Sequence, residues 1–222
     1  MPELDTQRLA GPRWGPASRG APKQVVVICH GIGADGHDLI SLAPSWGPTL
    51  PDAVFAAPDA PFVHDSGFGR QWWSVADRSP SVMEAGARRA APFLHRFVDD
   101  EITRLGLPPD AYALAGFSQG AMMVLFAGLR RPGAPRAILA YSGALIAPAS
   151  LAAELANRAP VLLVHGETDE TVLAARSREA EAALTAAGVP VESTFVPGIG
   201  HGIDETGVSA GALFLQRAFA SA

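Results

Sequence analysis

One serine in this sequence has the neighbours and the position of a nucleophile. Ser118 lies in Gly116-Phe117-Ser118-Gln119-Gly120, between an apolar run at 112–115 and an apolar stretch that starts at 119. The pattern G-x-S-x-G between a strand and a helix places the serine on a sharp, strained turn, and the small flanking glycines leave room for it. A helix that begins just after the serine directs backbone N–H groups toward it. Ser118 is therefore a candidate nucleophile, with a helix N-cap as its alternative role.

A serine nucleophile needs a base, and the sequence holds six histidines: His30, His37, His64, His95, His165 and His201. In hydrolases with this strand-turn-helix motif the chain order is serine, acid, histidine, which leaves His165 and His201. His165 ends an apolar run and precedes Gly166, which favours a structural role. His201 lies in the glycine-rich segment 198–202, which can bend over Ser118. We therefore predict His201 as the base.

The base in turn needs a carboxylate that fixes its tautomer and stabilises the imidazolium. Three acids follow the apolar run at 161–165: Glu167, Asp169 and Glu170. Asp169 lies within the expected turn, whereas Glu167 adjoins the strand and Glu170 enters the next helix, where acids commonly interact with the helix dipole. We therefore predict Asp169. The candidate serine, acid and histidine each follow a separate strand, and such loops meet at one edge of a parallel sheet.

The glycine-rich segment 30–36 follows the apolar run at 25–29 and permits two interpretations. In a hydrolase, the backbone N–H of Ile32 would join that of Gln119 in binding an oxyanion. The same segment matches G-x-G-x-x-G, which indicates a nicotinamide-dinucleotide-binding oxidoreductase. That motif expects an acid about 20 residues further on, at the end of the second strand. Asp59 falls there, but its flanking prolines indicate a turn beyond the strand, so the oxidoreductase is the weaker alternative.

Apolar, β-branched runs that alternate with helically spaced stretches predict the elements that carry these residues. The predicted strands cover 25–29, 53–57, 112–115, 137–141, 161–165 and 191–196, and the predicted helices cover 83–105, 119–131, 149–158, 172–187 and 209–220. This alternation predicts an α/β fold with a mostly parallel central sheet and helices on both faces. No shift in composition marks a linker, so we expect a single domain over 1–222, with 1–22 as an N-terminal extension or edge hairpin.

Composition narrows the possible partners. The formal charge of −5 disfavours nucleic acid, and 48% hydrophobic against 18% charged residues indicates a packed core. The single cysteine, Cys29, has apolar neighbours that predict burial, which suits a reducing compartment. The sequence shows no signal-peptide pattern, no apolar run long enough to span a membrane and no metal-ligand spacing. We expect a cytoplasmic protein, monomeric or homodimeric, without metal or cofactor and with a small-molecule ester as substrate.

Together the motifs resemble the carboxylesterase/phospholipase family that includes the acyl-protein thioesterases, within the α/β-hydrolases. The resemblance covers nearly the whole chain after about Lys23 and rests on five motifs: His30-Gly31-Ile32-Gly33-Ala34-Asp35-Gly36, Gln71-Trp72-Trp73, Gly116-Phe117-Ser118-Gln119-Gly120, His165-Gly166 with Asp169, and Gly200-His201-Gly202. It implies a cofactor-free serine hydrolase that acts on carboxylic esters, lysophospholipids or protein thioesters. Its implied triad is Ser118, Asp169 and His201, with oxyanion donors at Ile32 and Gln119. A non-catalytic binding protein on the same fold is the alternative.

Two segments depart from the family pattern where an acyl pocket is expected. Family members commonly have Trp-aromatic-Asp where this chain has Trp72-Trp73-Ser74, and Val-Val-Pro where it has Thr171-Val172-Leu173. The stretch 58–82 is long for a connection between a strand and a helix, so we expect it to border a partly open acyl groove. The candidate acyl contacts are large apolar residues, for which core packing is an equal alternative: Ile32, Phe68, Trp72, Trp73 and Met122.

Overall fold

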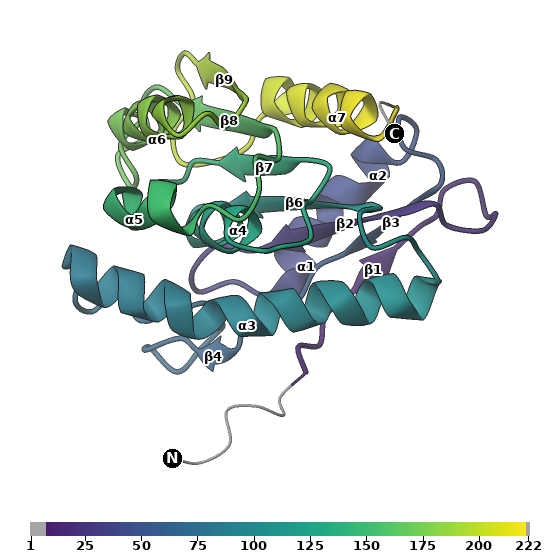
Figure 1. Ribbon diagram of the computed structural model, residues 1–222, viewed down its shortest axis with the longest axis horizontal. Helices are drawn as coiled ribbons and strands as arrows, with labels where there is room; N and C mark the ends of the chain where they lie inside the picture. Colours follow the sequence, from purple (N-terminus) through teal and green to yellow (C-terminus); the bar gives the residue numbers. More distant parts are fainter. Residues whose placement is uncertain (1–7, 221–222) are drawn as a thin grey trace.

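A mostly parallel sheet forms the centre of the structure, a computed structural model that describes residues 8–220 (Figure 1). Within that range the sheet has seven strands in the order β1-β3-β2-β6-β7-β8-β9. Their bounds are β1 Arg13–Trp14, β2 Gln24–Cys29, β3 Ala53–Ala56, β6 Tyr112–Phe117, β7 Ile138–Tyr141, β8 Val161–Gly166 and β9 Val191–Val196. The short β1 pairs antiparallel with β3, and the other pairings are parallel. The predicted fold class is confirmed.

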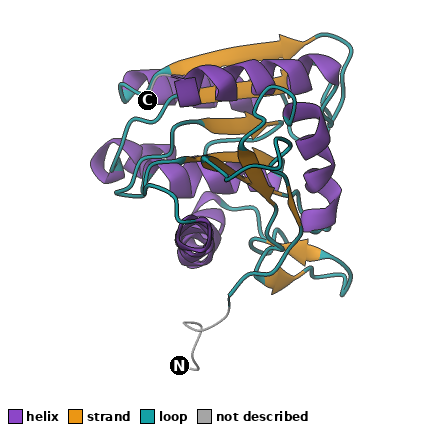
Figure 2. Cartoon of the chain, turned by 90° about the vertical axis from the view of Figure 1, so that its right-hand side faces the viewer, coloured by secondary structure: helices purple, strands orange, loops and turns teal. Residues whose placement is uncertain are grey.

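Helices cover both faces of this sheet (Figure 2). One face carries α3 (Pro80–Leu105), α4 (Gln119–Leu129), α5 (Pro148–Glu154) and α6 (Ala175–Ala186), and the other carries α1 (Gly36–Leu39), the 3₁₀ turn η1 (Ile40–Leu42), α2 (Ala43–Trp46) and α7 (Glu205–Ala220). Along β2, Val25 and Val27 pack with the first group, while Val26 and Ile28 pack with the second. All four side chains are fully buried, because the strand is covered on both sides.

The short elements escaped prediction, since too few residues set up a hydrophobic period. They are α1, η1, α2 and a separate antiparallel hairpin formed by β4 (Phe62–Val63) and β5 (Arg70–Gln71). Several predicted helix ends were also wrong. Helix α3 begins at Pro80 rather than at 83, because a proline in the first turn gives up an N–H that has no partner there. Helix α6 begins at Ala175 rather than at 172, because the preceding backbone forms a turn around Asp169.

The N-terminal segment closes one edge of the sheet. Arg13 and Trp14 pair with Ala56 and Phe55 of β3, and the Trp14 ring lies 5.9 Å from the Phe55 ring. The guanidinium of Arg13 forms an ion pair with the buried Glu101 of α3 at 2.5 Å. Of the predicted N-terminal extension, residues 1–7 lie outside the described part of the chain. None of the helices in residues 8–220 has the length and apolarity required to cross a membrane.

Candidate active site

The turn between β6 and α4 holds Ser118 in a backbone conformation that serine rarely adopts. Its φ of 54° and ψ of −118° lie in the left-handed half of conformational space. A Cβ at Gly116 would overlap the backbone of Gly120, and a Cβ at Gly120 would overlap the carbonyls of Cys29 and His30. The glycines that flank the serine therefore let the turn close tightly against the end of β2. This is the strained, glycine-dependent turn that the sequence predicts.

Ser118, His201 and Asp169 form one hydrogen-bonded row. The Nε2 atom of His201 lies 3.0 Å from Ser118 Oγ, and its Nδ1 atom lies 2.7 Å from Asp169 Oδ2. A carboxylate can only accept, so His201 Nδ1 donates to it, and Nε2 of the neutral ring accepts from the serine hydroxyl. The Phe117 ring packs 4.8 Å from the imidazole. These contacts meet the geometric requirement for a serine activated by a base that a third group orients.

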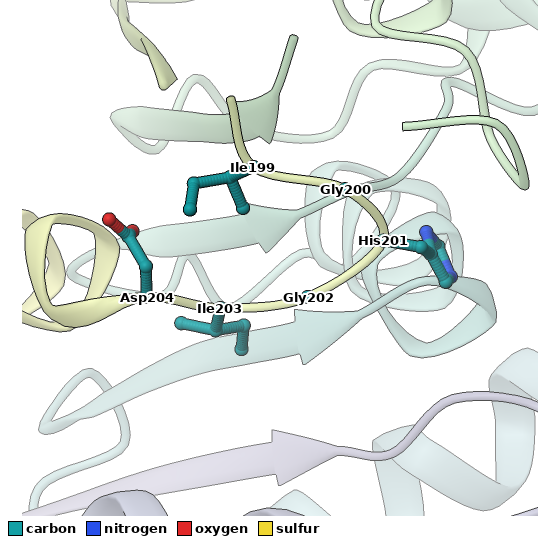
Figure 3. Close-up of a pocket in the computed structure, with 6 residues that line it drawn as sticks. All are labelled: Ile199, Gly200, His201, Gly202, Ile203 and Asp204. Atoms are coloured by element: carbon teal, nitrogen blue, oxygen red, sulfur yellow. The ribbon is translucent and has the colours of Figure 1, made fainter. Parts of the chain in front are cut away.

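His201 reaches the serine from the loop after β9. Figure 3 shows this loop, in which the His201 ring points away from the side chains of Ile199, Ile203 and Asp204. The residues of this loop from 199 to 204, His201 among them, line an open pocket. The three candidates thus come from the carboxyl ends of β6, β8 and β9, as expected for loops at one edge of a parallel sheet.

Asp169 is a fully buried carboxylate whose two oxygens are surrounded by donors. Oδ1 accepts from the backbone N–H groups of Thr171 at 2.8 Å and Val172 at 2.9 Å. Oδ2 accepts from His201 and also lies 3.1 Å from Nε2 of His165. Burial alone would raise the pKa of Asp169, but the hydrogen bonds from His201, Val172 and Thr171 outweigh burial and hold the pKa below its usual value. The group is therefore ionised at neutral pH.

The other two acids that follow β8 lie away from this row. Glu167 is exposed and forms an ion pair with Arg178 at 2.9 Å, and Glu170 is exposed as well. Neither makes a hydrogen bond to His201 in the described part of the chain. The geometry thus favours Asp169, as the turn position in the sequence did.

The loop after β2 lies directly against the serine turn. A Cβ added to Gly31 would lie 3.2 Å from Phe117 Cδ1 and 3.4 Å from Ser118 Cβ. Ile32 is therefore the residue directly after a point of contact with Ser118. In residues 8–220, the backbone N–H groups of Ile32 and Gln119 have no hydrogen-bond acceptor. Both N–H groups are therefore available as donors.

His30 and Asp59 hold this loop in place. Nε2 of His30 accepts from the N–H of Ala60 at 2.9 Å, so Nδ1 carries the proton and donates to the carbonyl of Gly31 at 2.7 Å. Burial lowers the pKa of His30, which keeps the ring neutral. Asp59 Oδ1 accepts from the N–H of Gly36 at 2.9 Å. A dinucleotide-binding site would need the carboxylate of Asp59 for the ribose hydroxyls, but here this carboxylate binds the backbone of the glycine-rich loop. This contact argues against the oxidoreductase alternative.

Of the candidate acyl contacts in the stretch 58–82, Trp72 and Trp73 pack into the core, while Phe68 is exposed. Trp72 is fully buried and Trp73 is 3% exposed, whereas Phe68, in the turn of the β4–β5 hairpin, is 84% exposed. The Trp72 ring N–H donates to the carbonyl of His30 at 3.1 Å, so this indole fills the core beneath the loop. Hydrophobic size left groove lining and core packing as equal alternatives for Trp72 and Trp73, and the structure has both indoles in the core. Met122 is half-buried, and its N–H donates to the carbonyl of Ser118 at 3.1 Å.

The side chain of Gln119 has a second role that sequence reasoning missed. Its Oε1 accepts from the N–H of Trp72 at 2.9 Å, and its Nε2 donates to the carbonyl of Trp73 at 2.7 Å. The residue after the nucleophile therefore fixes the segment that follows β5. No local pattern reveals this contact, because its partners lie 46 and 47 residues earlier in the chain.

Comparison with known proteins agrees with this architecture. Residues 16–218 match the phospholipase/carboxylesterase family. The chain belongs to this family. It is 29% identical to the esterase YpfH of Escherichia coli over 82% of this chain and 77% of that one, and 28% identical to acyl-protein thioesterase 1 of Neurospora crassa over 79% of each.

Solved structures show the same fold. The crystal structure of esterase PE8 superposes with a TM-score of 0.90 and 40% identity, covering 96% of this chain and all of that one. SOBER1 of Arabidopsis thaliana superposes with a TM-score of 0.80 and 25% identity, covering 88% and 99%. The chain thus has the α/β-hydrolase fold, and its family makes it a carboxylic ester hydrolase.

Proposed function

We propose that the protein is a serine esterase that works through an acyl-enzyme on Ser118. The observation that carries the proposal is the hydrogen-bonded row from Ser118 Oγ through His201 to Asp169, at 3.0 and 2.7 Å. The row supports catalysis because His201 can accept the serine proton at Nε2 while Asp169 stabilises the resulting imidazolium through Nδ1.

The proposed cycle has two halves. Ser118 Oγ attacks the acyl carbon and gives its proton to His201, and the N–H groups of Ile32 and Gln119 bind the oxyanion of the tetrahedral intermediate. The intermediate collapses as His201 returns the proton to the leaving alkoxide, so the alcohol departs and the acyl group stays on Ser118. Water then attacks this ester with His201 as base, and the carboxylic acid leaves as the serine regains its proton.

The same steps cleave a thioester, with a thiol as the leaving group. Similarity to the esterase YpfH and to acyl-protein thioesterase 1 therefore supports esters, thioesters and lysophospholipids as candidate substrates. We propose Ile32 and Met122 as acyl contacts, because both are half-buried and both adjoin Ser118 through the chain contacts described above. The buried Trp72 and Trp73 offer the acyl chain no exposed ring face.

Covalent labelling tests the nucleophile. A fluorophosphonate should add one adduct at Ser118 of the wild type, and Ser118→Ala should abolish labelling and hydrolysis of p-nitrophenyl esters. Ser142→Ala is a matched control, because Ser142 is also buried, directly follows the neighbouring strand β7 and has a positive φ of 49°. That variant should keep both labelling and rate. An adduct at another residue, or full activity in Ser118→Ala, would overturn the proposal.

A second variant tests the acid. Asp169→Asn replaces one acceptor oxygen of the carboxylate with an N–H donor, which favours the wrong tautomer of His201. The same change lowers kcat by about 10⁴-fold in another serine hydrolase. Glu170→Gln is the control, because Glu170 is exposed and lies next in the chain. If Glu170→Gln were the crippling change, the acid would be misassigned. Comparing p-nitrophenyl esters, acyl thioesters and lysophosphatidylcholine on the wild type would then define the substrate class.

A further inference from the structure

A second histidine, His165, contacts the same carboxylate oxygen of Asp169 as His201 does. We propose that His165 is a positioning residue that fixes Asp169 for its contact with His201. The proposal rests on the proposed function, in which Asp169 orients the base. The sequence pattern suggested no more for His165 than a structural place at the end of β8, whereas the structure brings its ring to the acid itself.

The proton on the facing nitrogen is assigned by its neighbours. Nε2 of His165 lies 3.1 Å from Asp169 Oδ2 and 2.7 Å from the carbonyl oxygen of Val172. Both oxygens only accept, so Nε2 must carry the proton and donate to the two of them together. The Nε2–H group of His165 thus binds both the carboxylate of Asp169 and the carbonyl of Val172, at the end of the turn that contains Asp169.

The far side of the ring is anchored as well. Nδ1 of His165 lies 2.6 Å from Oγ of Ser177 on α6, and that hydroxyl lies 3.2 Å from the carbonyl of Gly143, which follows β7. His165 and Ser177 are each only 1% exposed. With Nε2 protonated, Nδ1 of the neutral ring accepts the single hydroxyl proton of Ser177, because Nδ1 at 2.6 Å lies nearer to Oγ than the Gly143 carbonyl does at 3.2 Å. The ring is therefore held at both nitrogens and its rotation is prevented.

These contacts complete the set of donors around Asp169. A carboxylate has about four acceptor sites. Here Oδ1 takes two backbone N–H groups, and Oδ2 takes His201 Nδ1 and His165 Nε2. If His165 is lost, Oδ2 of Asp169 keeps only the hydrogen bond to His201, and the carbonyl of Val172 loses the donor that His165 supplies. The acid can then tilt away from the direction in which His201 needs its acceptor.

Replacement of His165 by two different side chains separates positioning from packing. His165→Phe fills the space without a donor, whereas the amide of His165→Gln can place an N–H near the original Nε2. Active sites are first counted with a fluorophosphonate, so that rates refer to folded protein. We expect His165→Phe to lower kcat by about 10- to 100-fold with little change in KM, on the scale of one hydrogen bond to a charged group. His165→Gln should restore most of the loss.

A spectroscopic signal follows the same contact. The proton between His201 Nδ1 and Asp169 should give a low-field ¹H resonance that shifts in His165→Phe and returns in His165→Gln. His95→Phe is the matched control, because within residues 8–220 the His95 ring makes one hydrogen bond, to the carbonyl of Ala127 at 3.1 Å, away from the site. Its kcat and its resonance should match those of the wild type.

Unchanged kcat and an unchanged resonance in titratable His165→Phe would overturn the inference, and so would a His165→Gln variant as slow as His165→Phe. If His165→Phe does not fold, Ser177→Ala removes only the far anchor of the ring and should lower kcat by about 3- to 10-fold. A wild-type kcat in Ser177→Ala would then refute the role. Failure of the proposed function looks different, because Ser118→Ala would keep its activity whatever residue stands at 165.

Discussion

The amide of Gln119 should contribute strongly to stability, and the substitution Gln119→Met tests this. Methionine has nearly the same shape and length but cannot make either hydrogen bond. The change would leave the N–H of Trp72 and the carbonyl of Trp73 without partners in a site where Gln119 is 2% exposed. Each unsatisfied buried group costs about 1 to 3 kcal/mol. The free energy of unfolding should therefore fall by about 2 to 6 kcal/mol, a large share of the roughly 5 to 15 kcal/mol typical of a domain.

Urea unfolding followed by tryptophan fluorescence measures this loss, and Gln71→Met is its control. Gln71 is 3% exposed and close in the chain, but its Oε1 has no partner in the described residues and its Nε2 bonds only to Asp65 at 2.7 Å. The control should lose about 1 kcal/mol or less. Hydrogen exchange should also show faster exchange of the Trp72 amide in Gln119→Met alone. Equal losses in the two variants would refute the reasoning.

Three further outcomes are expected. Gly120→Ala should fail to fold or lose more than about 3 kcal/mol of unfolding free energy, measured by circular dichroism, because its Cβ would overlap the Cys29 and His30 carbonyls. Gly202→Ala should stay near the wild type, because no atom lies within 4 Å of its Cβ. Similar melting of the two variants would contradict the packing argument. Ile32→Pro removes the proposed oxyanion donor at this position and should lower kcat about 100-fold or more. Ile32→Ala keeps the backbone N–H and should keep most of the rate. Equal rates in the two folded variants would exclude the N–H of Ile32 as a donor. Burial lowers the pKa of His95 in the folded state, so the unfolded chain binds this proton first as the pH falls below about 6.5. The free energy of unfolding therefore drops by up to about 1.4 kcal/mol per pH unit. Between pH 7 and 5 the urea midpoint should fall less steeply in His95→Gln than in the wild type, and parallel slopes would contradict this role of His95.

The features that the sequence could predict are those that depend on local pattern. Alternating apolar runs predicted the parallel sheet, because a strand covered on both faces must be apolar throughout. Turn position separated Asp169 from its neighbouring acids, and glycine spacing indicated the strain at Ser118. In each case the physical cause lies within a few residues of the chain.

The features that it could not predict depend on distant partners. Hydrophobic size does not tell whether a tryptophan fills a core or lines a groove, so the two roles were equal alternatives for Trp72 and Trp73 until the structure placed both rings in the core. The amide of Gln119 finds its partners in a segment far away in the chain, which no periodicity encodes. The contact of His165 with Asp169 is the exception. The two are four residues apart across a tight turn, and that spacing was a signal available in the sequence.

The left-handed conformation of Ser118 also shapes how this protein can be altered. Glycine is the residue that occupies such a conformation without penalty, and a serine there costs on the order of 1 kcal/mol or more. A selection for thermostability alone would therefore favour glycine at this position and discard the hydroxyl. The strained turn lowers the stability of the fold but keeps the Ser118 hydroxyl within 3.0 Å of His201, so substitutions chosen to stabilise the protein should leave this turn unchanged.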